Sequence, residues 1–139
     1  MANSQVLTNA SKLAALVGVV ANGNSVKAAL YLSSASIGTG TGAYTATGEV
    51  SGAGYTAGGV AVTHATAPAI SGTTAIWTPT ANISFTAVTI GPTDCVLLYN
   101  VTRSNESMGS WTFGAQTLVA GDLILVMPVN DASNALLRV

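Results

Sequence analysis

Residues 83–88 of the chain read ISFTAV, and this short stretch indicates how most of the protein folds. Successive side chains of a β-strand point to opposite faces of the sheet. Ile83, Phe85 and Ala87 therefore share one face, and the two hydroxyl-bearing residues between them share the other. The pattern predicts a half-buried β-strand. Comparable apolar or aromatic runs occur at 26–32, 60–62, 75–77, 96–100, 111–113 and 123–127.

Turn-forming residues separate these runs. Seven or eight short strands result, at a spacing of roughly 8–14 residues and without a helical pattern between them. This spacing is typical of an all-β fold, and we expect residues 26–139 to form one antiparallel β-sandwich or jelly-roll-like domain. Within it, the alternation at 26–32 predicts a strand with one buried face. The predicted turns, rich in Gly, Pro, Asn and Asp, are 71–72, 91–94, 103–109 and 120–122.

Residues 1–25 follow a different period. Their apolar residues recur every three or four positions, which is the spacing of one helical face. Thr8 or Asn9 is suited to cap the start of a short helix, and Asn22 with Gly23 to end it. We expect this segment to form an N-terminal arm with a short helix whose apolar face contacts a partner. The residues of that face are Leu13, Leu16, Val17 and Val20.

A signal peptide is the competing interpretation of this segment, with 13–21 as its apolar centre. The positively charged start of such a peptide is missing, because Lys12 is the first basic residue. The run 13–21 is also shorter than the stretch of about 18 apolar residues that a membrane helix needs. We therefore favour the helical arm and expect no membrane partner.

Residues 38–59 form a glycine-rich loop that holds eight of the 15 glycines. Glycine at this density costs backbone entropy on folding, so the loop is either mobile or held in place by its neighbours. Tyr44 and Tyr55 are its aromatic residues, and we predict that they contact a partner. The other aromatic residues in strand-like runs are predicted to pack in the core.

Charge is scarce in this chain of 139 residues. Four Lys and Arg and five Asp and Glu make 6% charged residues, with a net charge of −1, whereas soluble domains average about 25%. The four basic residues are scattered and form no patch for nucleic acid. So little charge gives weak protection against self-association. We therefore expect partners, including further copies of the chain, to cover much of the surface.

None of the chain's residues matches a complete catalytic or ligand-binding motif. The run GTGTG at 38–42 lacks the following helix and the Lys-Ser or Lys-Thr of a phosphate-binding loop. His64 lies among small residues, and Cys95, the single cysteine, opens an apolar run as a buried small residue would. The acidic residues are scattered and mostly in turns. We therefore predict no catalytic residue, no metal site and no cofactor.

Four blocks of sequence carry a resemblance to a known group of proteins. They are VKAALY at 26–31, GEVSGAGYTAGG at 48–59, ISFTA at 83–87 and VLLYN at 96–100. In this order of blocks, the chain resembles small β-rich structural proteins of tailed bacteriophages, in which a similar Gly-Tyr-x-x-Gly-Gly phrase precedes a strand. The resemblance runs loosely from residue 26 to the C-terminus and leaves out residues 1–25.

The resemblance implies a non-enzymatic virion protein, assembled in the bacterial cytoplasm, whose partners are the major capsid protein or other virion proteins. Together with the charge-poor composition, it predicts a homo-oligomer that decorates or cements the head through residues 1–25 and 38–59. A tail, neck or fibre component, including a module that binds a receptor or glycan, is the second hypothesis. A secreted bacterial adhesin or surface module is the third.

Overall fold

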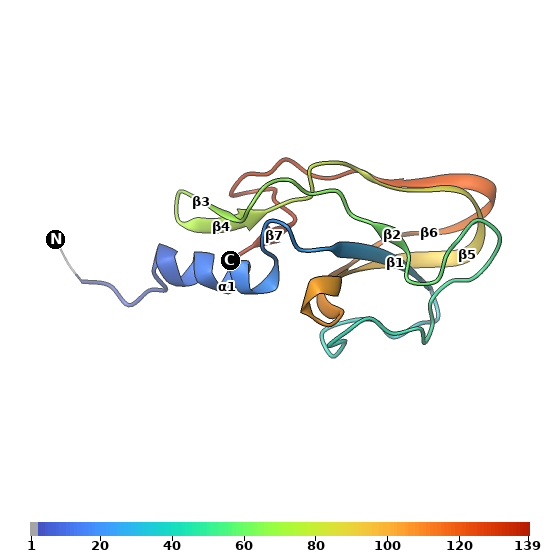
Figure 1. The fold of residues 1–139 in the computed structure, drawn as a ribbon, viewed down its shortest axis with the longest axis horizontal. Helices are drawn as coiled ribbons and strands as arrows, with labels where there is room; N and C mark the ends of the chain where they lie inside the picture. Colours follow the sequence, from blue (N-terminus) through green and yellow to red (C-terminus); the bar gives the residue numbers. More distant parts are fainter. Residues whose placement is uncertain (1–2) are drawn as a thin grey trace. The chain divides into compact units, whose positions relative to one another are not determined.

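The computed structural model of the protein describes residues 3–139 and contains two antiparallel sheets and one α-helix (Figure 1). The strand order is β2-β1-β5-β6 in the first sheet and β3-β4-β7 in the second. The predicted all-β class with a short N-terminal helix is confirmed. Positions 1–2 of the predicted arm lie outside the described residues. The elements are α1 (Asn9–Val19), β1 (Val26–Leu32), β2 (Val60–Ala61), β3 (Ala69–Ser71), β4 (Thr74–Trp77), β5 (Ile83–Asn100), the 3₁₀ turn η1 (Val101–Arg103), β6 (Glu106–Leu125) and β7 (Leu137–Arg138).

The chain folds as two compact units, each assembled from segments that are distant in sequence. The first, which we call the helix unit, comprises residues 3–23, 64–80 and 127–139. The second, which we call the hairpin unit, comprises residues 24–63 and 81–126. The helix expected in an N-terminal arm therefore belongs to a packed unit that also contains the three-stranded sheet.

In the helix unit, α1 begins at a hydrogen-bonded cap. Thr8 is the cap residue, and its side chain accepts a hydrogen bond from the backbone N–H of Ser11 at 3.3 Å. The helix ends at Val19, a few residues before the predicted stop. It packs against β4 and β3, and Leu16 and Val20 are buried in this unit. The apolar spacing that predicts the helix thus also marks the side that faces the sheet.

In the hairpin unit, β5 is the central strand. It pairs antiparallel with β6 from Ile83 to Asn100, and its C-terminal half also pairs with β1. The register sets Leu30 of β1 opposite Val96 of β5, and Val96 opposite Trp111 of β6. β1 and β5 supply most of the buried residues of this unit because each lies between two neighbours.

The two long strands correct the predicted strand pattern. β5 has 18 residues and β6 has 20, and each joins two runs that the sequence predicts as separate strands. β5 begins and ends at the outer bounds of its two predicted runs, whereas β6 begins at Glu106, inside the predicted turn 103–109, and stops at Leu125. The joined runs are 83–88 with 96–100, and 111–113 with 123–127.

The predicted turns at 91–94 and 120–122 lie inside these strands. The β5–β6 pairing shifts register near both places, and Ala87, Gly91 and Ala120 have φ angles of 50°, 146° and 47°. A β-bulge accommodates an extra residue with such a conformation and bends the strand while pairing continues on either side. Turn-forming residues at these positions therefore mark bulges, and the prediction of strand ends there was wrong.

β1 is buried on both faces, which corrects the prediction of one buried face. Ala29 and Tyr31, which alternate with the predicted core positions, are each 0% exposed. The segment after β1 folds back over this second face and covers it. The residues buried together there are Ala29, Tyr31, Cys95, Leu97 and Tyr99, with Ala35, Ile37 and Tyr44 packed against them.

The glycine-rich loop 38–59 is held by its neighbours, which decides between the two alternatives for this segment. The backbone N–H of Val50 donates to the carbonyl of Leu30 in β1 at 3.0 Å. The backbone N–H of Thr89 in β5 donates to the carbonyl of Ala53 at 2.8 Å. The loop therefore follows the outer edge of β1 and then the first half of β5.

Two glycines allow the loop to approach the strands this closely. Gly59 has a φ angle of 82°, and a Cβ there would overlap the carbonyl oxygen of Ala28. Gly54 has a φ angle of 80°, and a Cβ there would overlap the carbonyl oxygen of Ala87. Residues with a side chain rarely adopt this left-handed conformation, so both the φ angle and the available space require glycine.

Replacing Gly59 by Ala is expected to lower the free energy of unfolding by about 2–4 kcal/mol, because the new Cβ must displace β1 and hold an unfavourable φ. Gly40→Ala is the matched control, since Gly40 is exposed and a Cβ there meets no atom within 4 Å. Urea unfolding followed by far-UV circular dichroism measures both variants. Equal losses for the two would contradict the close approach of loop and strand.

Candidate functional site

A carboxylate within the glycine-rich loop accepts three hydrogen bonds. Oε2 of Glu49 accepts one from the hydroxyl of Tyr44 at 2.6 Å. Oε1 accepts one from the hydroxyl of Tyr55 at 2.7 Å and one from the backbone N–H of Gly58 at 2.8 Å. Hydrogen bonds to a charged acceptor are about twice as strong as neutral ones. Because Glu49 is half-buried, these donors replace part of its lost hydration and close the loop around it.

The other two tyrosines attach the same loop to the sheet. The hydroxyl of Tyr99 donates to the carbonyl of Gly58 at 2.5 Å, and that of Tyr31 donates to the carbonyl of Thr45 at 2.7 Å. The ring of Tyr99 also stacks on that of Tyr44, with centroids 4.9 Å apart. All four tyrosines of the chain therefore hold the loop. We refer to Glu49 with Tyr31, Tyr44, Tyr55 and Tyr99 as the Glu49–tyrosine cluster.

The environment of the cluster raises the pKa of each tyrosine in it. Burial raises the pKa of Tyr31 to about 12. The hydrogen bond to Glu49, with burial, raises the pKa of Tyr44. Burial is the main cause of the raised pKa of Tyr55 and of Tyr99, and the nearby Glu49 adds to both. A tyrosinate beside the Glu49 carboxylate is unfavourable, so the hydroxyls remain protonated donors.

The structure places the predicted partner contacts Tyr44 and Tyr55 inside this cluster. Both are half-buried, and both hydroxyls donate to Glu49. The ring of Tyr55 stacks on that of Phe85 of β5, with centroids 6.0 Å apart and the ring planes inclined by 21°. Their role in this structure is to hold the loop. A single acidic residue between two tyrosines in an otherwise uncharged segment is the sequence signal that points to the cluster.

The four predicted contact residues of the helix occupy different environments. Leu16 is 2% exposed and Val20 is 0% exposed, so neither side chain lies at a surface that a partner could contact in this structure. They pack in the core of the helix unit because α1 lies on the three-stranded sheet. Leu13 is half-buried, and Val17 is 42% exposed and remains at the surface.

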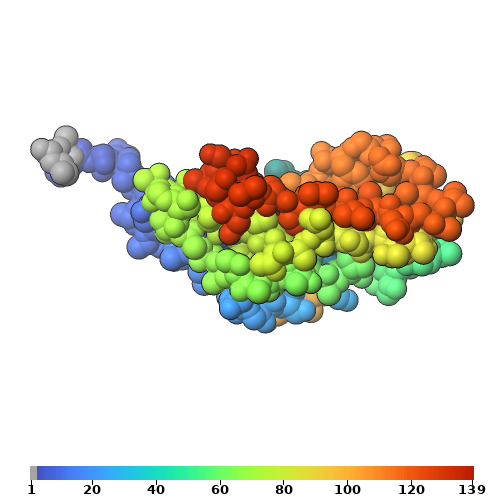
Figure 2. All heavy atoms as spheres, turned by 90° about the horizontal axis from the view of Figure 1, so that it is seen from above, coloured from blue at the N-terminus to red at the C-terminus, as the bar shows by residue number. Residues whose placement is uncertain are grey.

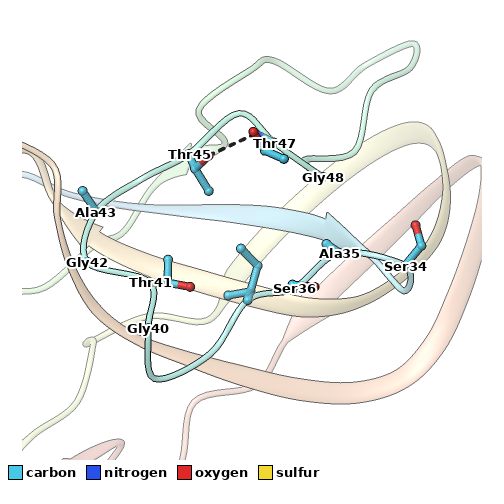
Figure 3. Close-up of a pocket in the computed structure, with 11 residues that line it drawn as sticks. Ser34, Ala35, Ser36, Gly40, Thr41, Gly42, Ala43, Thr45, Thr47 and Gly48 are labelled. Atoms are coloured by element: carbon cyan, nitrogen blue, oxygen red, sulfur yellow. Dashed lines mark hydrogen bonds between the residues drawn. The ribbon is translucent and has the colours of Figure 1, made fainter.

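A hollow of about 470 Å³ lies beside the glycine-rich loop (Figure 3). Methyl groups, hydroxyl groups and backbone line it, and the backbone N–H of Thr47 donates to Oγ1 of Thr45 at 3.2 Å within the lining. Hydroxyls can bind a polar ligand, but the lining has neither a charged group nor an aromatic ring on which a sugar could stack. The lining residues are Ser34, Ala35, Ser36, Ile37, Gly40, Thr41, Gly42, Ala43, Thr45, Thr47 and Gly48.

The residues that sequence analysis considers for chemistry lie in structural positions. Cys95 is buried as predicted, and burial raises the pKa of its thiol, which weakens it as a nucleophile. The ring of His64 is half-buried and meets the ring of Trp77 edge-on at 5.5 Å. Among residues 3–139, no three His, Cys, Asp or Glu side chains are grouped so that they could hold a metal ion. No helix in this range is both long and apolar enough to cross a membrane.

The outer edge of β6 is the feature that sequence analysis missed. At its start, the backbone N–H of Ser107 donates to the carbonyl of Gly42 in the loop at 3.1 Å. From residue 108 onward, the backbone of β6 has hydrogen-bond partners only on the β5 side within the described chain. β6, drawn in orange, lies at the surface in Figure 2. Val119 and Ile124 of this strand are 80% and 55% exposed.

A scan against protein-family models, a search of curated proteins and a search of solved structures each find no match to this chain.

Removing the Glu49 carboxylate is expected to destabilise the hairpin unit by about 2–4 kcal/mol, because three donors lose their acceptor. The test variant is Glu49→Ala. The control is Glu106→Ala, because the carboxylate of Glu106 is exposed and lies 3.7 Å from Nε of Arg103. A surface pair of this kind contributes about 0–1 kcal/mol. Urea unfolding of both variants measures the difference, and similar losses for the two would show that the cluster does not hold the loop.

Stability is expected to fall as the pH rises above 10, the usual pKa of tyrosine. Between pH 10 and about 12, the unfolded chain releases tyrosyl protons while the folded chain retains that of Tyr31. The folded state then binds more protons, so its stability decreases with increasing pH. Denaturant unfolding across this range measures the decrease, and Tyr31→Phe should make it shallower. An unchanged slope in Tyr31→Phe would contradict the raised pKa.

Proposed function

We propose that the chain is a non-enzymatic structural protein of a tailed-bacteriophage virion that decorates or cements the head. The observation that carries this proposal is the character of the surface. Among residues 3–139, nine large apolar residues are exposed, as many as the formally charged residues of the whole chain. The exposed apolar residues are Val6, Leu7, Val17, Val101, Val119, Ile124, Val126, Val129 and Val139.

Such a surface suits a subunit that neighbours cover on several sides. Apolar area gains about 25 cal/mol per Å² when another surface excludes water from it. The net charge of −1 gives copies of the chain little electrostatic repulsion. Apolar contacts also weaken little with salt, whereas ion pairs at a surface are screened. A cement protein that remains attached to a particle through changing salt conditions uses contacts of this type.

The glycine-rich loop supports the same proposal. Its block 48–59 carries the resemblance to phage structural proteins, and Glu49, Gly54 and Gly59 hold it against the sheet. A loop fixed in this way presents one shape to a partner at a small cost in conformational entropy. A decoration protein depends on a fixed shape that many identical sites on a particle can bind.

The proposal predicts that the chain is a high-copy component of purified phage particles. Quantitative mass spectrometry should give a copy number on the order of hundreds, because a decorating subunit repeats with the symmetry of the shell. The copies should remain bound when the salt concentration is raised to about 1 M, since apolar contacts are not screened. Heads purified without tails serve as the control and should retain the same number of copies.

The copy number also separates the alternative locations. A few copies, lost when tails are removed, would overturn head decoration and favour a tail, neck or fibre component. Absence of the chain from purified particles would overturn the virion assignment altogether.

A further inference from the structure

We infer that two copies of the chain associate through the outer edges of their β6 strands, which pair antiparallel about a two-fold axis. The strand edges of the hairpin unit support this pairing. The pairing does not depend on the proposed phage function. The partner is a second copy of the same chain because of three features of the sheet: an open edge, a closed opposite side and the distribution of charge.

The β6 edge has the features that favour pairing with another strand. From residue 108 onward and within the described chain, its outward backbone groups have no partner. The run 107–121 contains no charged residue and no proline. Proteins usually protect an edge strand with lysine, proline or a very short length. Lysine and proline are absent along this run, and β6 is long. Its pairing with β5 shifts register at 112–116 and 118–121, but from residue 108 onward the outward backbone groups remain available to a second strand.

The opposite side of the same sheet offers no comparable edge. β2 is only two residues long. Beside it, the glycine-rich loop occupies the edge of β1: the backbone N–H of Leu32 donates to the carbonyl of Gly48 at 2.8 Å, and that of Val50 donates to Leu30 at 3.0 Å. The loop also covers the first half of β5, as described above. The β6 edge of one copy therefore finds no different open edge on the hairpin unit of another copy.

The partner of β6 is therefore its own counterpart. Pairing of identical edges is isologous, and a two-fold axis makes the two strands antiparallel. The two four-stranded sheets join into one continuous sheet in the order β2-β1-β5-β6-β6-β5-β1-β2, and pairing through β6 stops at two copies because the long open edge of each hairpin unit is then used. Pairing over 108–121 extends about 45 Å, and because bulges interrupt β6 it forms on the order of ten backbone hydrogen bonds.

The distribution of charge places the axis near the middle of the run. Glu106 and Asp122 flank residues 107–121. An axis near residue 114 lets the uncharged run pair along its length, since any distant axis would set an acidic side chain against the middle of the partner's run. Glu106 of one copy then lies near Asp122 of the other, but only at the exposed ends of the interface, where salt screens their repulsion. Residues 114–117 are exposed and uncharged, with small residues at the first two positions. Ala115 then lies close to Ala115 of the second copy, which makes it the position at which to test the pairing.

Sedimentation velocity of the full chain should show a species of twice the 13.8 kDa chain mass. Ala115→Lys sets two ammonium groups near each other across the axis and should raise the dissociation constant of the dimer at least about tenfold. Ala115→Ser is the matched control and should leave the constant unchanged. An equimolar mixture of Ala115→Lys and Ala115→Glu should restore the dimer. A monomeric wild type, or a dimer that Ala115→Lys does not weaken, would overturn the inference.

Cysteine scanning along β6 tests the symmetry of the pair. Single cysteines replace Thr112, Gly114, Gln116 or Leu118 in the full chain, whose own Cys95 is buried. Only a residue near the axis lies opposite its counterpart, and each step of two residues adds about 13 Å to the separation of the pair. Oxidation should therefore give cross-linked dimer with one maximum along the strand. Thr66→Cys, an exposed position in the helix unit, is the control and should cross-link weakly.

Uniform cross-linking along β6, or equal cross-linking of Thr66→Cys, would overturn the two-fold pairing. These measurements use the chain in solution, so their failure leaves the copy number on particles unaffected. Conversely, a symmetric dimer remains established if the chain is absent from phage particles.

Discussion

The hydrogen bonds from Tyr44 and Tyr55 to Glu49 close the glycine-rich loop, and much of the hairpin unit depends on that closure. Once closed, the loop covers the second face of β1 and occupies its outer edge. The same closure leaves β6 as the long open edge of the sheet within the described chain. One half-buried carboxylate therefore influences both the interior of the unit and the surface that it presents to partners.

Small residues serve two purposes in this protein. At Gly54 and Gly59, the missing side chain lets the loop backbone contact the strands, and positive φ angles become accessible. Eight of the fourteen residues at 108–121 are Gly, Ala, Ser or Thr and none is charged, which leaves the outer backbone of β6 open to another strand. The composition that makes the chain poor in charge is thus the composition that its close backbone contacts require.

Local patterns predicted several features correctly. The cap at Thr8, the helix that follows it and the burial of Cys95 could all be predicted, because helix period, capping and apolar runs depend on neighbouring residues. The joining of two runs into one long strand could not be predicted, because turns and bulges use the same residue types, as at Gly91 and Ala120. The burial of Leu16 was also missed, because an apolar helical face predicts a contact but does not identify what covers it.

The sequence by itself determined the all-β class, the N-terminal helix and a surface with few charges, because these follow from side-chain type and period along the chain. Only the tertiary structure decided that Glu49 binds two tyrosines of its own loop, that β5 and β6 run continuously through their bulges and that β6 keeps an open edge. The physical reason is that each of these features depends on which distant backbone groups meet. Hydrogen-bond partners of the main chain are not encoded in the side chains of a local segment.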